Sequence, residues 1–425
     1  MAVTDGLRVR ILHVTPSFYP AWAYGGVTRV AYELCRALVQ RGEAVSVWTT
    51  DVLDARARTS DTEAMVDGIH IRYFRNVSNR LAYHRQLYLP RGLWMHARHH
   101  IRDFDLVHLH AHRHMLNSIV GAVLRRAGIP YVFSGHGTVQ PVERYLRIKR
   151  VVDTFGGRAL LQRADACVAV ANAEVAHYRA LGVDVQRVQV IPNGLRLDDY
   201  VSIPARGTFR AQHALGDAPF VLFVGKITPR KGVDILVQAL ARLRADVQLV
   251  IAGPFMMPDA PIRELVQRLG LEQRVRFVGL LSDEQKRAAY ADAEVVAYPS
   301  VHEIFGLVPF EALLCGTPVV VCDDSGCGEV LGAAGAALLV PYGDVQALGE
   351  ALQRLLDDPA SGRATVARGR DYIEGHLGWE RIAERTAALY RDILERRRST
   401  AAVSAAAPLL TGARPDARYA PTHSK

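Results

Sequence analysis

The sequence predicts an α/β protein built from two doubly wound, Rossmann-like domains. Short apolar segments alternate with amphipathic segments along most of the chain, a pattern typical of strand–helix–strand units and a parallel sheet. This series breaks once, near residues 193–216, and then starts again. The chain of 425 residues is also long enough for two or three domains of roughly 150 residues each.

The first series of elements fills residues 1–193, which we interpret as the N-terminal domain. Short apolar runs set the strands, and an amphipathic pattern of period 3.6 sets the helices. The expected strands are Arg8–Val14, Ala44–Thr50, Ile69–Phe74, Leu106–His110, Tyr131–Ser134, Ala166–Ala171 and Val188–Ile191, and the expected helices are Thr28–Arg41 and Asn117–Ala127.

The second series follows an expected interdomain linker, residues 194–216, which is punctuated by glycine and proline. It forms the C-terminal domain, residues 217–375. The expected strands are Phe220–Val224, Val247–Ala252, Val275–Val278, Val295–Tyr298 and Pro318–Cys322, and the expected helices are Val233–Leu243, Ile262–Leu269, Asp283–Ala291, Val308–Leu314 and Val345–Leu356. A last helix is expected over 376–398. Residues 399–425, rich in Ala, Ser, Pro and Thr, are expected to form a disordered tail.

Composition and charge restrict the function classes. Hydrophobic residues make up 49% and charged residues 22%, as in soluble globular proteins. No apolar run reaches the roughly 18 residues of a membrane span, and no secretory signal is visible. Five scattered cysteines without a CxxC pair predict reduced, mostly buried thiols in a cytoplasmic protein. The net charge of +9 favours anionic partners, meaning nucleotides, phosphates, nucleic acid or an anionic membrane surface.

The most informative segment, residues 302–313, follows the expected strand Val295–Tyr298 and continues as a helix. The free N–H groups of a helix start beside Gly306 suit a phosphate. Glu303 lies just before this helix, where it can meet a ligand. Glu311, which we place about two turns along, can accept hydrogen bonds from a diol. The spacing alone equally fits a Glu303 favoured by the helix dipole and an ordinary surface Glu311.

A cationic loop follows the expected strand Phe220–Val224. Lys226, Arg230 and Lys231 lie between this strand and the next helix. Such a loop can clamp a diphosphate with its ammonium groups, and its position at the carboxyl end of a strand favours that role. A solvated basic turn is the alternative.

Two glycine-flanked loops follow strands of the N-terminal domain. Tyr24-Gly25-Gly26-Val27 follows the first strand, and Ser134-Gly135-His136-Gly137-Thr138 follows another. Glycine allows a close backbone approach to a ligand. A histidine between glycines at a strand end is freer to serve a site than one packed in a core.

The ordered set of these motifs resembles the group 1 family of retaining glycosyltransferases, often called GT4, which has the GT-B architecture. The motifs run in family order over about residues 8–395. They are Gly25-Gly26, His136-Gly137-Thr138, Ile191–Gly194, Gly225–Gly232, Glu303–Glu311, Gly316–Val320, Glu329 and Pro341–Asp344.

The resemblance implies an architecture and a reaction. The two domains would face a cleft, with the acceptor on the N-terminal domain, the donor on the C-terminal domain, and the last helix returning to the N-terminal domain. A sugar would pass from a nucleotide diphosphate to an acceptor hydroxyl with retention at the anomeric carbon. No metal or other cofactor is expected, since the nucleotide sugar is the donor substrate.

The resemblance also implies roles for residues. Lys226 and Lys231 would hold the diphosphate, Glu303 would meet the donor sugar, Glu311 would bind the ribose diol, and His136 would lie near the reacting centre. Glu303, His136 and Lys231 are thus the expected catalytic residues. Backbone N–H groups would complete the phosphate cradle, from Gly26, Phe305, Gly306, Leu307 and Val308.

Two positions depart from the family pattern. Lys226 stands where arginine is common, so a bidentate grip becomes a point charge. Ile304 stands where a small residue is common. Both departures leave the identity of the donor open.

Two further patterns suggest metal binding, and we expect neither to bind metal. Asp103-Phe104-Asp105 matches the DxD of metal-dependent glycosyltransferases but also fits the start of the strand Leu106–His110. His108, His110, His112 and His114 alternate and would share one strand face. No cysteine or carboxylate completes a site around them.

The stretch from Arg91 to Arg163 carries most of the net charge. It holds 12 Lys and Arg against 4 Asp and Glu, a balance of +8. Arg144, Arg147 and Arg150 alternate with apolar residues in an expected basic amphipathic helix. This predicts an anionic acceptor, such as a lipid-linked diphosphate sugar, met at the inner membrane face. The family resemblance implies a saccharide or lipid-linked acceptor, in polysaccharide or glycolipid synthesis of the bacterial type. A solvated helix face is the alternative.

Two other functions remain to be distinguished. One is a two-Rossmann sugar-nucleotide epimerase, or a phosphorylase, although no segment suggests the pyridoxal-binding lysine that a phosphorylase needs. The other is a non-catalytic basic protein that binds nucleic acid or a membrane surface. The charged set Glu303, Glu311, Lys226 and Lys231 argues against the second, and we expect no nucleic-acid partner.

Overall fold

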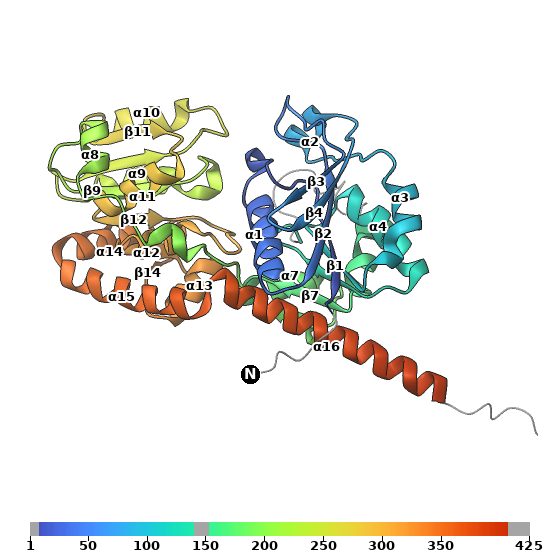
Figure 1. Ribbon diagram of the computed structural model, residues 1–425. Helices are drawn as coiled ribbons and strands as arrows, with labels where there is room; N and C mark the ends of the chain where they lie inside the picture. The colour runs from blue at the N-terminus through green and yellow to red at the C-terminus, as the bar shows by residue number, and fades with distance from the viewer. Residues whose placement is uncertain (1–7, 140–152, 407–425) are drawn as a thin grey trace, which may run out of the picture.

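The computed structural model describes residues 8–139 and 153–406, which form two α/β domains (Figure 1). The N-terminal sheet has eight strands in the order β3-β4-β2-β1-β5-β6-β7-β8. Its strands are β1 Arg10–Val14, β2 Ala44–Thr50, β3 Glu63–Val66, β4 Ile69–Phe74, β5 Leu106–His110, β6 Tyr131–Ser134, β7 Ala166–Ala169 and β8 Val188–Val190. The helices of this domain are α1 Gly26–Gln40, α2 Asn79–Arg85, α3 Leu93–His100, α4 Met115–Ala127, α6 Arg158–Gln162 and α7 Asn172–Ala180.

The C-terminal sheet has six strands in the order β11-β10-β9-β12-β13-β14. These are β9 Phe220–Val224, β10 Gln248–Ala252, β11 Val275–Gly279, β12 Val295–Tyr298, β13 Val319–Cys322 and β14 Leu338–Val340. The helices are α8 Thr208–His213, α9 Val233–Leu240, α10 Ala260–Arg268, α11 Asp283–Asp292, α12 Val308–Leu314, α13 Gly326–Ala333, α14 Val345–Asp357, α15 Pro359–His376 and α16 Trp379–Ala406.

Both sheets follow the predicted doubly wound α/β class. Every described strand pair is parallel except the antiparallel pair of β3 and β4 at the edge. Strands such as β9 and β12 are buried along their whole length, because helices cover both faces. The carboxyl ends of parallel strands meet along one edge, where loops can gather into a site.

The expected linker 194–216 differs from the structure in its second half. Helix α8 lies inside this range and packs against α11 of the C-terminal domain. Phe209 and Leu215 are buried in that domain's core, and Arg210 is ion-paired with Glu294. Phe209 and Leu215 are too few to show a helical period in the sequence, but their burial attaches residues 208–215 to the C-terminal domain.

The start of the expected tail is also wrong, because α16 continues to Ala406. The helix leaves the C-terminal domain and runs along the N-terminal domain (Figure 1), where it packs against α1. The chain crosses between the domains at two adjacent points. The N–H of Leu195 donates to the carbonyl of Leu377 at 2.7 Å, and a Cβ at Gly194 would lie 2.5 Å from the Trp379 ring.

All five cysteines are buried and unpaired, which confirms the expectation of reduced, buried thiols. Among the described helices, none combines the length and apolar character needed to cross a bilayer.

Candidate active site

The loop between β12 and α12 holds Glu303 in a fixed position. Gly306 takes a left-handed conformation with φ of 71°, and a Cβ there would lie 2.9 Å from both Glu303 Cγ and the Tyr298 ring. Only glycine fits this position. Next to it, buried Phe305 stacks on Phe310 with ring centroids 4.9 Å apart. This stack fixes the loop onto the helix that follows it.

Lys231, Tyr298 and Glu303 form one hydrogen-bonded cluster. The Lys231 ammonium donates to the Tyr298 hydroxyl at 2.6 Å and is ion-paired with Glu303 Oε2. The Tyr298 hydroxyl donates to the same Oε2 at 3.1 Å, and Lys231 Nζ lies 4.5 Å from the centre of the Tyr298 ring. Burial raises the pKa of Tyr298 well above its usual value, so this hydroxyl stays protonated.

Lys231 has a protein partner in this cluster. The family resemblance implies a role for Lys231 on the diphosphate, and the structure also pairs its ammonium group with Glu303, whose side chain is only 24% exposed. Lys231 therefore orients the carboxylate of Glu303. Tyr298, the last residue of β12, was not anticipated, because its sequence pattern is that of an ordinary strand residue.

Glu311 lies in the first turn of α12, not two turns along it, because the helix begins at Val308. Its carboxylate accepts a hydrogen bond of 2.9 Å from the Tyr290 hydroxyl, and Lys286 Nζ lies 3.7 Å away. Both partners come from α11 and were missed, since contacts between helices leave no local signal in a sequence. Leu307 precedes α12 without a capping side chain.

Lys226 reaches across to the N-terminal domain. Its Nζ lies 3.7 Å from the position of a Cβ at Gly25, which has φ of 96° and immediately precedes α1. Gly26 is the first residue of α1, and no side chain caps this helix start. Within the described part of the chain, Lys226 forms no ion pair. A free cation and a helix N-terminus therefore lie together between the domains, an arrangement that favours an anion.

The His136 loop is held from behind by two buried side chains of α7. The N–H of Gly137 donates to Glu174 at 2.6 Å, and the N–H of Gly135 donates to the Tyr178 hydroxyl at 2.7 Å. Burial raises the pKa of Glu174 to about 7. His136 itself has φ of 50°, an uncommon value for a non-glycine residue that occurs preferentially at functional sites.

The His136 loop and the Glu303 loop are in contact. A Cβ at Gly137 would lie 2.8 Å from Cγ1 of Ile304, the residue after Glu303. Burial lowers the pKa of His136 to about 4, so its imidazole is neutral at physiological pH. The structure thus brings His136, Glu303 and Lys231 into one region between the domains.

The row of four histidines does not share one strand face. β5 ends at His110, and Ala111 and Arg113 then adopt left-handed conformations that break the alternation. His112 instead bonds to Asp153 at 2.9 Å, and Arg113 pairs with the same carboxylate.

Asp103 and Asp105 of the DxD pattern also have structural partners. Asp105 pairs with Arg10 at 2.8 Å, and Asp103 lies 3.1 Å from His100. Both carboxylates thus make contacts within the segment that precedes β5 or with β1 beside it.

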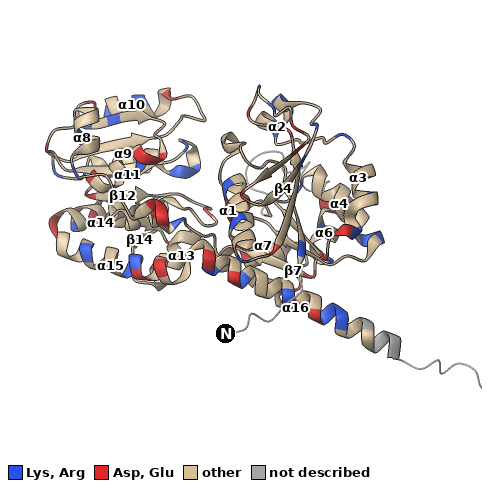
Figure 2. Ribbon diagram, in the orientation of Figure 1, with Lys and Arg blue, Asp and Glu red and all other residues tan. Residues whose placement is uncertain are grey.

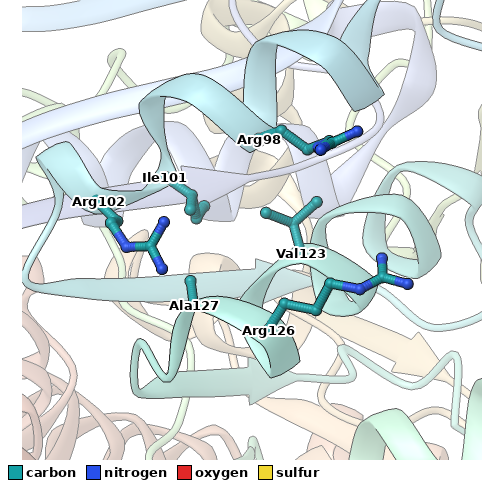
Figure 3. Close-up of a pocket in the computed structure, with 6 residues that line it drawn as sticks. All are labelled: Arg98, Ile101, Arg102, Val123, Arg126 and Ala127. Carbon is teal, nitrogen blue, oxygen red and sulfur yellow. The ribbon is translucent and has the colours of Figure 1, made fainter.

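Only part of the basic stretch 91–163 can be described. Its expected amphipathic helix, with Arg144, Arg147, Lys149 and Arg150, lies outside the described residues. Figure 2 shows basic residues on α4 and along α16. A cavity of about 220 Å³ lies where α3 and α4 meet, and Figure 3 shows its lining: Arg98, Ile101, Arg102, Val123, Arg126 and Ala127. The expected site residues lie elsewhere.

Comparison of the chain with known proteins identifies its family and several similar proteins. Residues 24–199 match the family described as Glycosyltransferase Family 4, and residues 205–372 match Glycosyl transferases group 1. The chain is 32% identical to a D-inositol 3-phosphate glycosyltransferase of Kineococcus radiotolerans, over 92% of this chain and 96% of that protein. It is 29% identical to the protein of that name from Xylanimonas cellulosilytica, over 93% and 99% of the two chains.

Solved structures show the same architecture. Sucrose-phosphate synthase from Thermosynechococcus elongatus superposes with a TM-score of 0.73 at 26% identity, over 92% of this chain and all of that one. Anabaena HepE in complex with UDP and glucose gives 0.72 at 21%, over 91% and 100%. The chain therefore belongs to the group 1, family 4 glycosyltransferases, which are nucleotide-sugar-dependent enzymes, and it has their GT-B fold.

Proposed function

We propose that this enzyme transfers a sugar, with retention of anomeric configuration and without a metal, from a nucleotide diphosphate to a hydroxyl of a phosphate-bearing acceptor. One observation carries the proposal. The Lys231–Tyr298–Glu303 cluster of one domain lies directly against the His136 loop of the other, through the contact of Ile304 with Gly137. A sugar bound there would be reached by groups from both domains.

The donor diphosphate would lie between the start of α1 and the start of α12. Lys226 supplies a cation without a protein partner among the described residues, and the amides of Gly26, Leu307 and Val308 lie in helix starts without side-chain caps. Preorganised donors of this kind stabilise the charge that develops on a leaving phosphate. Glu311, already oriented by Tyr290, has lone pairs left for the ribose hydroxyls.

The transfer would need no protein base opposite the sugar. The bond between the anomeric carbon and the diphosphate oxygen breaks as the acceptor oxygen bonds to the same face. The acceptor proton passes to the departing phosphate oxygen. Glu303, held by Lys231 and Tyr298, would bind donor-sugar hydroxyls and position the anomeric carbon.

An anionic acceptor is supported by two observations. The relatives named above act on D-inositol 3-phosphate, a soluble phosphate ester. The exposed arginines Arg98, Arg102 and Arg126 line a cavity on the N-terminal domain (Figure 3). Their positive charge would attract the enzyme to an anionic membrane, where the acceptor would be a lipid-linked diphosphate sugar. In the second case the enzyme would work in polysaccharide or glycolipid synthesis at the inner membrane face.

A substrate screen tests the proposal in two steps. A thermal-shift series with UDP, GDP and ADP identifies the base, since a ligand at 100 times its Kd adds about 2.7 kcal/mol of stability. The matching nucleotide sugars are then offered with D-inositol 3-phosphate or with a lipid-linked diphosphate sugar. Release of nucleoside diphosphate together with a glycosylated acceptor supports the proposal. Conversion of the donor into an epimer, or no binding of any nucleotide, would contradict it.

A further inference from the structure

Three histidines, two from the neighbouring strands β1 and β5 and one from the loop that follows β6, form a chain of hydrogen bonds. His136 Nε2 lies 2.9 Å from His110 Nδ1, and His110 Nε2 lies 2.8 Å from His13 Nδ1. The rings of His13 and His110 stack at 18°, and those of His110 and His136 at 7°. His13 and His110 are completely buried. The expected catalytic histidine is therefore connected to two others behind it.

Strand pairing explains the alignment. β1 and β6 both flank β5, and the register places His13 beside His108 and Ser134 beside His110. His110 thus lies between the end of β1 and the loop that follows β6. The sequence pattern singled out His110 only as part of an alternating row, and His13 not at all.

The two bonds couple the protonation of all three rings. Burial lowers the pKa of each imidazole, so each is neutral and carries one N–H. His110 must donate from one nitrogen and accept at the other. If His110 carries its proton on Nδ1, the other two rings must also carry theirs on Nδ1. If it carries it on Nε2, all three must carry it on Nε2.

The unpaired ends of the chain choose between these states. His13 Nε2 and His136 Nδ1 are buried and have no partner among the described residues. In the Nε2–H state the unpaired donor is on His13, deep in the core, where an orphaned N–H is costly. In the Nδ1–H state it is on His136, at the interface where the donor sugar and acceptor are proposed to meet and can accept its bond.

We propose that His110 and His13 are positioning residues that hold His136 in its Nδ1–H tautomer, so that His136 donates a hydrogen bond to a substrate oxygen. The inference rests on the proposed function for the identity of that oxygen. The tautomer itself can be observed without any substrate.

A metal site formed by the same residues fits the geometry less well. Ring nitrogens of His13, His108 and His110 lie within 4.8 Å of one another. However, the contact of 2.8 Å between His13 and His110 is shorter than the roughly 3.3 Å between two ligands at 2.0–2.1 Å from a tetrahedral zinc ion. Both nitrogens of His108 are already bonded, to the Tyr390 hydroxyl at 2.6 Å and to Ser134 Oγ at 2.7 Å.

Nitrogen NMR of the full-length protein labelled with ¹⁵N-histidine tests the tautomer. We expect a protonated Nδ1 and an unprotonated Nε2 for His13, His110 and His136, assigned by single substitutions. His110→Phe keeps an aromatic ring at this position and removes both hydrogen bonds, so the His136 signals should lose this pattern. Protonated Nε2 in all three rings, or a stoichiometric metal found by elemental analysis of the purified protein, would overturn the proposal.

Kinetics test the consequence. His110→Phe should lower kcat by 10- to 100-fold while the donor KM changes less than threefold. The control is Tyr390→Phe, which removes one hydrogen bond from buried His108 and should change neither kcat nor the His136 signals. An unchanged kcat in His110→Phe with an altered His136 tautomer would refute the positioning role. If His136→Ala keeps full activity while the NMR pattern holds, the failure lies instead in the proposed role of His136.

Discussion

Ile304 packs against Gly137 across the two domains, at a separation that leaves no room for a Cβ on residue 137. The isoleucine departs from the small residue common at this position in the family, and the bare backbone of the His136 loop accommodates it. The two loops that carry Glu303 and His136 are therefore fitted to each other. A substitution in either loop should therefore disturb the position of the other loop.

Gly137→Ala should destabilise the protein by about 1–3 kcal/mol, because φ of +79° is unfavourable for alanine and its methyl group would meet Ile304. Adding Ile304→Ala should recover part of the lost stability and of kcat/KM, with a coupling of at least about 0.5 kcal/mol. Gly128→Ala is the control, since it has φ of +72° with nothing within 4 Å. Equal rescue of both glycine variants by Ile304→Ala would refute the contact.

Lys226→Ala should weaken nucleoside diphosphate binding about tenfold or more and leave nucleoside binding unchanged, because it removes one charge-assisted contact. Lys226→Arg keeps the charge and should bind like the wild type. Arg263→Ala removes an exposed charge that is paired with Asp259 in the same domain, and serves as the control. Calorimetry with matched nucleoside and diphosphate checks this. Equal diphosphate affinity in Lys226→Ala and wild type would exclude the clamp.

Glu174 predicts a pH dependence of stability. Its pKa is about 7 in the fold and about 4.3 in an unfolded chain, so the native state binds the extra proton between these values. The stabilisation from protonated Glu174 is fully present below the pKa of the unfolded chain and is lost as the pH rises through the folded pKa of about 7. Glu174 should therefore lower the free energy of unfolding by about 3 kcal/mol between pH 4.5 and 8, against the rise that the buried histidines with lowered pKa contribute over the same range. In urea unfolding, Glu174→Gln should thus gain stability relative to the wild type as the pH rises from 4.5 to 8, whereas the exposed control Glu350→Gln should not; a difference between Glu174→Gln and wild type that does not change with pH would contradict the assignment.

The basic cavity between α3 and α4 can be tested with vesicles. Replacing Arg98, Arg102 and Arg126 by serine should reduce co-sedimentation with anionic vesicles about tenfold or more at low salt, given about 1 kcal/mol per basic residue near the surface. A control triple on the C-terminal domain, Arg263, Arg268 and Arg276 to serine, loses the same charge. If both triples behave alike, or if the wild type binds no vesicles at low salt, a soluble acceptor is the better explanation.

The sequence predicts the strand cores well, because β9 and β12 are apolar along their whole length and flanked by turns. It misses β3, whose alternately exposed residues lie at a sheet edge. It also misses α8, which is six residues long and held by tertiary contacts to α11. A helix this short has too few turns to show a period.

For the site, local patterns identify the residues but not their partners. The sequence shows directly that Glu303, Lys231 and His136 each follow the end of an apolar strand segment. The hydrogen bonds of Tyr298 to Glu303 and of His110 to His136 join segments that only the folded sheet brings together. The prediction that His108, His110, His112 and His114 share one strand face was wrong, because Ala111 adopts a left-handed conformation and the alternation ends after His110.

The most direct test is the anomeric configuration of the product, followed by NMR during transfer by wild type and by Glu303→Gln. We predict that the product keeps the configuration of the donor sugar. We also predict that Glu303→Gln lowers kcat by about 10²–10³, the effect of losing one contact made in the transition state, while the Kd for the nucleoside diphosphate changes little. A product of inverted configuration, or a wild-type kcat in Glu303→Gln, would contradict the account.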